Sequence, residues 1–261
     1  MSEWHLIDLH VHSALSPCAD DEMVPRQVIQ RCREIGLTLI AICDHNSCQN
    51  VGAFMKAAYG TGITVIAGME LTTSEEVHVL CLFPDLVSAC RWDNEVSRSL
   101  PPVENSPKLF GHQLLLGSEG EVIGEVRTLL LSASSLSLAT TCQMVEGDLK
   151  GLVIPAHIDR TSFSLIGQLG FPPPDIAFSA MELSQNSSRE SFVARNPFLR
   201  ATTMIHGSDA HRLRDLWAPK QTVVRVERPS FSELVAALRR EGERRVVTDL
   251  LTCDESLVPR P

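Results

Sequence analysis

Apolar runs alternate with amphipathic stretches along most of the chain. Residues 37–43, 63–71 and 152–157 are almost continuously apolar, which is typical of strands buried on both faces. Residues 19–36 and 51–58 carry apolar side chains three or four positions apart, the spacing of a helix with one buried face. Strands that alternate with helices predict an α/β fold with a mostly parallel sheet, and at least six such units favour a barrel as readily as an open sheet.

One segment, at about residues 98–134, interrupts this alternation. It begins with a Pro-rich loop and contains LLLGSEGEVIGEV, which predicts a β-hairpin with its turn at SEGE. We therefore expect an insertion that covers a site. Strands and helices alternate again after it, and we treat residues 1–261 as a single domain.

Composition and charge narrow the class of protein. The chain has 261 residues, of which 44% are hydrophobic, and a net charge of −9. It shows neither a secretory pattern nor an apolar run of the ~18 residues that a membrane span needs, and its eight cysteines are scattered. We expect a cytoplasmic protein without a membrane partner. The acidic charge makes nucleic acid an unlikely partner, but it leaves a small phosphorylated substrate possible.

Metal-binding residue types recur at the strands, mostly where the strands end. Because the ends of parallel strands meet at one rim, these side chains should lie close together. Two histidines at alternate positions of one strand also point the same way, as His10 and His12 would. The full set is His10, His12, His45, Glu70, His78, His157, Asp209 and His211.

A metal centre is the simplest chemistry for such a set. Divalent cations accept imidazole nitrogen and carboxylate oxygen at about 2.0–2.2 Å, whereas the same groups crowded together without a cation would carry a large desolvation cost. Each motif alone is weak, but their joint occurrence predicts a metal site. We expect His5, His112 and His206 to be structural, and the cysteines other than Cys18 to be buried fillers.

The order of the motifs DLHVHSALS, AICDHN, GMEL, VHVLCLF, IPAH and GSDAH resembles the polymerase and histidinol phosphatase (PHP) domain family of metal-dependent phosphoesterases. The resemblance covers roughly residues 6–99 and 135–215. It implies a distorted (βα)7-type barrel, with the 98–134 hairpin segment inserted. It also implies two or three divalent ions, Zn, Mn or Fe, in a cleft where the strands end.

The resemblance further implies how the ligands divide among the metals. The first metal would be held by His10, His12, Glu70 and Asp209. Glu70 would bridge to a second metal, completed by His78 and His157. His45 and His211 would hold a third, with Cys18 at a position where some family members carry a histidine. Asp20 and Asp21 are the alternatives to Cys18.

Hydrolysis of a small phosphate ester, of nucleotide or sugar phosphate type, is the function that this resemblance implies. The expected nucleophile is a metal-bound water or hydroxide, with no side-chain nucleophile. Arg160 is the first candidate to contact phosphate, followed by Arg189 and Arg212, and Asp44 is expected to orient ligands or their loop. The alternatives are an amidohydrolase-like cleavage of a C–N bond, a non-catalytic metal- or nucleotide-sensing module and, less favoured by the acidic charge, a nuclease.

Overall fold

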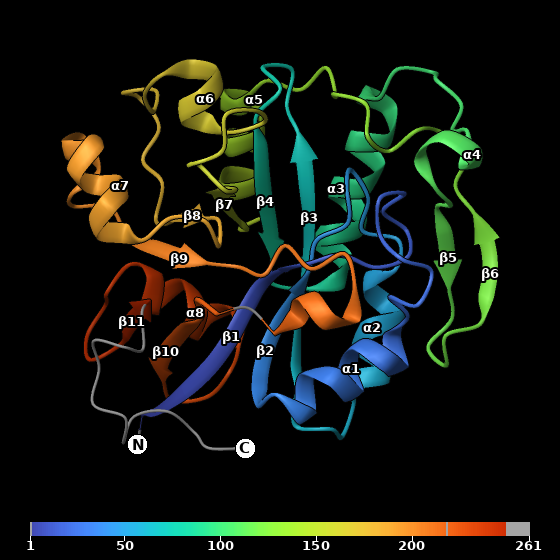
Figure 1. The fold of residues 1–261 in the computed structure, drawn as a ribbon, viewed down its shortest axis with the longest axis horizontal. Coiled ribbons are helices and arrows are strands. Elements are labelled where there is room, and N and C mark those ends of the chain that lie inside the picture. The colour runs from blue at the N-terminus through green and yellow to red at the C-terminus, as the bar shows by residue number, and fades with distance from the viewer. Residues whose placement is uncertain (1, 218, 249–261) are drawn as a thin grey trace.

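A seven-stranded sheet forms the framework of the computed structural model, which describes residues 2–217 and 219–248 (Figure 1). In spatial order its strands are β11 (Arg245–Thr248), β10 (Thr222–Val226), β1 (Glu3–Val11), β2 (Leu37–Ile42), β3 (Thr64–Thr72), β4 (His78–Phe83) and β7 (Leu152–Pro155). Two further strands, β8 (Met181–Leu183) and β9 (Met204–His206), form a separate parallel pair. Strand β8 contacts β7, and strand β9 contacts β11. The two edges of the sheet are thereby joined into a distorted barrel, as expected.

Strand direction decides which residues reach the rim. Strands β1, β2 and β3 pair in parallel, while β4 is antiparallel to both β3 and β7, and β10 is antiparallel to both β1 and β11. Five of the seven strands therefore run one way, but four of the six neighbouring pairs are antiparallel, so the α/β sheet is mixed. Because β4 runs the other way, its first residue, His78, lies at the rim where β3 and β7 end.

Helices α1 (Pro25–Glu34), α2 (Val51–Ala58) and α3 (Leu86–Ser99) follow β1, β2 and β4 in the chain. Helix α1 begins at Pro25 rather than near residue 19, because Met23 N donates to Asp20 O in a turn and proline suits the first helical position. Helix α3 was not predicted.

The remaining helices are α4 (Pro107–Phe110), α5 (Leu138–Cys142), η1 (Gln143–Asp148), α6 (Leu165–Leu169), α7 (Arg189–Arg195), η2 (Pro197–Leu199), η3 (Leu213–Leu216) and α8 (Phe231–Leu238). Among the described residues, no helix has the length and apolarity that crossing a membrane requires.

Apolar side chains form separate clusters on the two faces of the sheet. Successive residues of a strand point to opposite faces, so Leu39 belongs to the inner cluster with Leu80 and Leu238, and Ile40 to the outer cluster with Phe54. Burying a side chain of this size contributes about 1.5–3 kcal/mol. With apolar clusters on both faces, the strands are held firmly and their polar ends are fixed in space.

The insertion contains the predicted hairpin, formed by β5 (Leu114–Leu116) and β6 (Val122–Glu125). It packs against the loops that follow β1 and β2. Leu114 N donates to Ala14 O at 2.8 Å, and the Asn50 side chain bonds the backbone of Leu114 and Leu116 at 3.0 and 2.9 Å. The hairpin therefore supports the two loops beside the rim.

Candidate metal centre

Glu70, near the end of β3, is buried at the middle of the rim. Its Oε1 lies 2.8 Å from His78 Nδ1 and 3.0 Å from His157 Nε2, and its Oε2 lies 3.0 Å from His45 Nδ1. These histidines come from the start of β4 and from the segments that follow β7 and β2. The carboxylate therefore faces imidazoles from three different parts of the chain. Of these, His45, Glu70 and His78 have ligand atoms spaced to hold one ion.

A second group surrounds the end of β1. His10 Nε2 and His12 Nε2 are 3.1 Å apart, and they lie 3.4 and 3.2 Å from Asp209 Oδ1. Both nitrogens are also 3.4 Å from Glu70 Oε2. His10, His12, Glu70 and Asp209 have the spacing of one metal site, and they are the four residues that the resemblance assigned to the first metal.

The third group of suitable spacing contains His12, His45 and His211. The rings of His12 and His211 stack with centroids 4.1 Å apart. Cys18 and His157 fall outside the three groups; the exposed Cys18 thiol contributes to the raised pKa of His45, after the larger effect of the Glu70 charge. The structure thus brings together all eight predicted histidines and carboxylates, His157 through its 3.0 Å contact with Glu70.

Two residues of the centre adopt a backbone conformation that L-residues rarely use. His157 has φ of 31° and Asp209 has φ of 52°. Each such residue costs about 1–3 kcal/mol, and such residues cluster at functional sites. The fold therefore holds the two side chains in place against their local backbone preference.

Glu182 on β8 is the main residue of the centre that the sequence did not reveal. Both of its carboxylate oxygens lie 3.1 Å from His10 Nδ1, and Oε1 also accepts a hydrogen bond from His157 N at 3.2 Å. A carboxylate can only accept, so His10 Nδ1 carries the proton and its Nε2 presents a lone pair to the centre.

Asp44 fixes His12 in a similar way through a serine. Ser16 Oγ donates to Asp44 Oδ1 at 2.7 Å, accepts from His45 N at 3.1 Å and lies 2.8 Å from His12 Nδ1. Because the single hydroxyl proton is used on Asp44, His12 Nδ1 donates to Ser16 and leaves Nε2 free as a ligand. Asp44 therefore orients a ring of the centre, as expected from the sequence.

Two buried polar atoms of the centre lack hydrogen-bond partners in the part of the chain that the structure describes, which indicates a metal site. Glu70 Oε2 and His45 Nδ1 are fully buried and 3.0 Å apart, yet neither makes a hydrogen bond within the described residues. Buried polar atoms without partners are rare because each costs about 1–3 kcal/mol. A cation between them would satisfy both atoms, and the donor set of imidazole and carboxylate suits zinc, manganese or iron.

The electrostatics of the centre also favour positive charge. Burial alone would lower the pKa of His12 and His45, but the neighbouring carboxylates of Asp209 and Glu70 raise the pKa of His12, and the charge of Glu70 raises that of His45, to about 9 each. Burial would raise the pKa of Glu70, but His78 and His10 bring it well below its ordinary value. Burial and the charge of His12 lower the pKa of His211 to about 3, so this ring is neutral and can bind a cation beside the negative charge of Glu70.

Arg160 is the one predicted phosphate contact that lies at the centre. Its Nη2 is 2.6 Å from Asp209 Oδ2, and its side chain is 42% exposed. Arg189 instead donates to Arg200 O at 2.8 Å, and Arg212 lies 3.4 Å from the carboxylate of Asp20.

The histidines expected to be structural have partners away from the centre. His5 Nδ1 lies 3.2 Å from Thr38 Oγ1, and His112 pairs with Glu125 in the insertion. His206 Nδ1 donates to Leu183 O. These contacts agree with the structural interpretation of all three residues.

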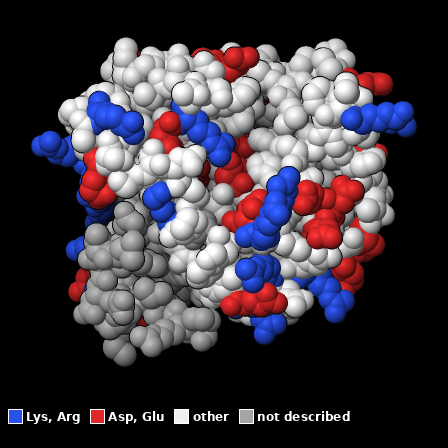
Figure 2. All heavy atoms as spheres, in the orientation of Figure 1, with Lys and Arg blue, Asp and Glu red and all other residues white. Residues whose placement is uncertain are grey.

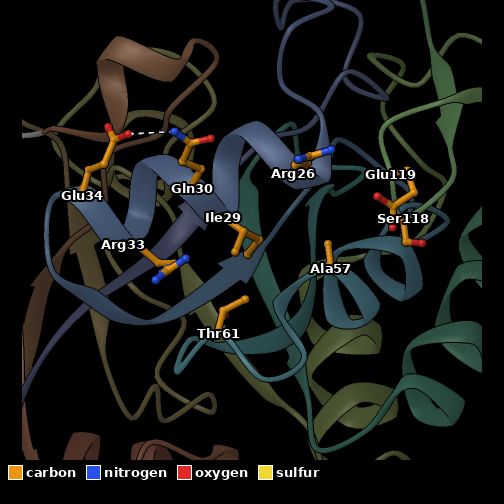
Figure 3. A pocket seen from close by; sticks show the side chains of 9 residues that line it. All are labelled: Arg26, Ile29, Gln30, Arg33, Glu34, Ala57, Thr61, Ser118 and Glu119. Atoms are coloured by element: carbon orange, nitrogen blue, oxygen red, sulfur yellow. Dashed lines mark hydrogen bonds between the residues drawn. The ribbon is translucent and has the colours of Figure 1, made fainter.

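A cavity of about 680 Å³ lies elsewhere, between α1, α2 and the β5–β6 turn (Figure 3). Its lining mixes signs of charge, with Arg26 and Arg33 facing the same space as Glu34 and Glu119. It includes no residue of the metal centre, and we assign it no role in the chemistry.

Comparisons with known proteins relate this geometry to nucleic-acid enzymes. A 5′-3′ exoribonuclease of Haemophilus influenzae is 32% identical over 78 residues, which is 29% of this chain and 27% of that enzyme. The structure of a lesion-specific endonuclease, endonuclease Q, from Pyrococcus furiosus matches 94% of this chain and 58% of its own with a TM-score of 0.75 and 18% identity. A second endonuclease Q structure, with a 27-mer duplex substrate carrying an abasic lesion at the active site, matches with a TM-score of 0.65.

A hydrolase of another class has the same fold. An amidohydrolase from Chromobacterium violaceum matches 80% of this chain and 88% of its own, with a TM-score of 0.54 and 18% identity. At these identities the solved structures establish the fold alone. The chain spans little more than a quarter of the exoribonuclease and 58% of endonuclease Q.

These relatives correct one expectation. We expected a small phosphorylated substrate and regarded nucleic acid as an unlikely partner, because the net charge is acidic. The exclusion of nucleic acid is wrong, since endonuclease Q acts on DNA and the Haemophilus relative is an exoribonuclease. Net charge failed as a guide because it averages the whole surface, whereas a metal centre provides its positive charge locally.

A family model confirms the resemblance read from the motifs. The PHP domain model matches residues 8–146, more than half of the chain, including the segments that carry His10, His45 and Glu70. The chain therefore belongs to the PHP domain family.

Proposed function

We propose that this protein is a metal-dependent phosphodiesterase that cleaves nucleic acid. The observation that carries the proposal is the convergence of Glu70 with seven other imidazole and carboxylate side chains, among them buried atoms that lack hydrogen-bond partners in the described chain. Endonuclease Q, which shares the fold, and the exoribonuclease that matches part of the sequence support this substrate class. We further propose that residues 1–261 form one domain, because the centre takes residues from both ends of the chain.

Two or three divalent ions would be held by the three groups of side chains. The first would take His10, His12, Glu70 and Asp209. The second would share Glu70 with His78 and His45, the group of suitable spacing, and with His157, whose Nε2 lies 3.0 Å from Glu70 Oε1. The third would take His45 and His211, with Cys18 as a further ligand. Bound there, such ions activate water and neutralise charge on a phosphoryl group.

The chain's own residues orient the ligands and bind the phosphate. Glu182 and the Asp44–Ser16 pair hold the outer nitrogens of His10 and His12. Arg160 would donate to a phosphate oxygen from its exposed position beside Asp209.

The serines nearest to the centre are poorly suited to be nucleophiles. Ser13 and Ser16 are both buried, and both donate their hydroxyl protons to Asp44. This arrangement supports water as the nucleophile rather than a side chain.

The charge distribution suggests how the substrate is recognised. Lys and Arg side chains are interspersed with Asp and Glu on the face shown in Figure 2. A surface of this kind binds phosphate backbones weakly over a long path. We propose that recognition is local, through the bound ions, Arg160 and the loops around them.

The cysteines of the described residues are all free, which agrees with a reducing cytoplasm.

Hydrolysis of a C–N bond is the second candidate, because the Chromobacterium structure with this fold is described as an amidohydrolase. A metal-activated water can attack either class of substrate, so the cluster alone does not separate them. The exposed guanidinium of Arg160 favours an anionic substrate and hence the phosphodiester.

A substrate screen on metal-loaded protein tests the proposal. The purified chain would be stripped of metal, reloaded with zinc, manganese or iron, and incubated with single-stranded RNA, single-stranded DNA, duplex DNA with an abasic site, and cyclic amides. We expect cleavage of at least one nucleic acid, abolished by EDTA. His12→Gln serves as the inactive control and His112→Gln as the active one. Cleavage of amides alone, or metal binding without any hydrolysis, would contradict the proposal.

A further inference from the structure

Phe163 lies against His78 on the outer side of the metal centre. Its ring stacks on the imidazole of His78, with centroids 4.8 Å apart and an interplanar angle of 27°. The residue is nevertheless 42% exposed. A phenylalanine with one face on a residue of the centre and much of its surface in water presents an aromatic platform to an incoming ligand.

The backbone holds this ring in place. Phe163 O accepts a hydrogen bond from His78 N at 2.9 Å, which ties the loop to the first residue of β4. Phe163 has φ of 53°, a conformation unusual for a bulky residue. The next residue, Ser164, caps α6 by accepting from Gly167 N. An exposed aromatic ring fixed in a strained conformation beside a candidate active site indicates a functional role.

The same loop carries a group for phosphate. Arg160 lies three residues earlier, and Ser164 Oγ donates to Arg160 O at 2.6 Å. The guanidinium lies beside Asp209, whereas the Phe163 ring lies beside His78. The residues of the centre that these two side chains contact are partly exposed: His78 is 13% and Asp209 is 14% exposed. His211 is 23% exposed, whereas His10 and His12 are fully buried. One short loop thus offers a cation and an aromatic face where the centre opens to solvent.

We propose that Phe163 stacks on an unpaired base of the nucleotide next to the scissile phosphate. This inference rests on the proposed nucleic-acid substrate and narrows it to single-stranded or locally unpaired nucleotides. A base can lie against a side chain only when it has left its own helical stack. Because every base has a π-face, such a platform is tolerant of sequence.

A binding comparison tests the role of Phe163 without requiring turnover. The probes are a short single-stranded deoxyadenosine oligonucleotide and an all-abasic oligomer of the same length, each with a 3′ fluorescein label. Both have the same phosphates, so their difference reports the bases. Removing one base–aromatic contact weakens binding by about tenfold. We expect the wild-type protein, loaded with manganese, to prefer the base-bearing strand by about this factor in fluorescence anisotropy.

Phe163→Leu keeps an apolar cover over His78 but removes the aromatic face. It should lose the preference for the base-bearing strand with an unchanged metal content, whereas Phe163→Trp should retain the preference. Phe171→Leu, at another exposed phenylalanine, is the matched control and should behave as wild type. A Phe163→Leu variant that still prefers the base-bearing strand, or a wild type that does not distinguish the strands, overturns the stacking role. If the preference is present and depends on Phe163 but no phosphodiester is cleaved, the stacking role is supported and the proposed hydrolysis fails.

Discussion

Glu182 and His10 form a buried carboxylate–imidazole pair, in which both carboxylate oxygens lie 3.1 Å from His10 Nδ1 and neither side chain is more than 1% exposed. His112 and Glu125 make a contact of the same length in the insertion, where both side chains are at least 40% exposed. The chain therefore contains the same chemical pair in two environments. Only the buried pair adjoins the metal centre, so the two can be compared directly.

Glu182→Gln should weaken metal binding. The amide keeps the size of the side chain but loses the charge and one acceptor, so His10 is held less firmly and its Nε2 becomes a poorer ligand. Loss of such an outer partner costs about 10–100-fold in metal affinity. Titration of the stripped protein with zinc, followed by calorimetry, measures this change.

Glu125→Gln is the matched control for Glu182→Gln, and it should bind zinc as the wild type does. Circular dichroism checks that both variants remain folded. Equal zinc affinity in Glu182→Gln and Glu125→Gln would show that Glu182 does not position His10.

The sequence could predict most of the centre because its residues follow apolar runs. His10, His45 and Glu70 each stand out at the end of a strand-like segment, and the five residues between β3 and β4 leave room only for an antiparallel turn, which places His78 at the rim. Helix α3 could also have been predicted. Asp85 caps it by accepting from Ser88 N, and Ala89, Trp92 and Val96 form its buried stripe.

Glu182 could not be predicted, for a physical reason. A glutamate within a short strand-like segment is ordinarily a solvated residue of an exposed face. Its partner His10 is 172 positions away, and nothing local indicates that β8 turns this side chain inward. The same limit applies to Phe163, because its stacking on His78 depends on how the loop after β7 folds back.

Metal binding should stabilise the fold measurably. The centre joins β1, β3 and β4 to the segments after β7 and β9, so an ion bound there is bound only by the folded chain. At a free-metal concentration of about 100 times Kd the gain is about 2.7 kcal/mol, which corresponds to a rise in Tm of about 5–10 °C. Differential scanning fluorimetry with manganese or EDTA measures the shift, and His12→Gln should reduce it. A Tm that does not respond to metal would contradict a metal centre at this rim.

Cys18 and Asp20 compete for the role of an additional ligand of the third group. The Asp20 carboxylate is already 3.4 Å from Arg212 Nε, whereas the Cys18 thiol is exposed and free. We expect cobalt-loaded protein to show a thiolate-to-cobalt charge-transfer band that disappears in Cys18→Ser. The band should persist in Asp20→Asn and in Cys90→Ser, which removes another exposed thiol. Its absence from the wild-type protein would exclude Cys18 from the metal site.

Arg160→Gln should lower activity on nucleic acid without reducing the metal content. The guanidinium contacts Asp209 from the solvent side, so its removal takes away a charge-assisted contact to phosphate but none of the candidate ligands. A hydrogen bond of this type is worth about 1.5–3 kcal/mol, which predicts a fall of about 10–100-fold in kcat/KM. Arg212→Gln, at the arginine that faces Asp20, is the control and should retain activity. Wild-type kcat/KM in Arg160→Gln would remove this residue from substrate binding.

Asp209→Asn should nearly abolish turnover while leaving the fold intact. Asp209 Oδ1 lies within 3.4 Å of both His10 Nε2 and His12 Nε2, and loss of its charge weakens the site that these three residues form with Glu70. Asparagine tolerates the φ of 52° at this position better than alanine does, so the substitution separates chemistry from backbone strain. We expect kcat to fall by about 10²-fold or more, by analogy with the loss of one stabilising group at other active sites. Rates measured at saturating manganese, with Tm recorded in EDTA, separate loss of the ligand from loss of the fold. A variant that retains full activity and its metal would place Asp209 outside the metal site.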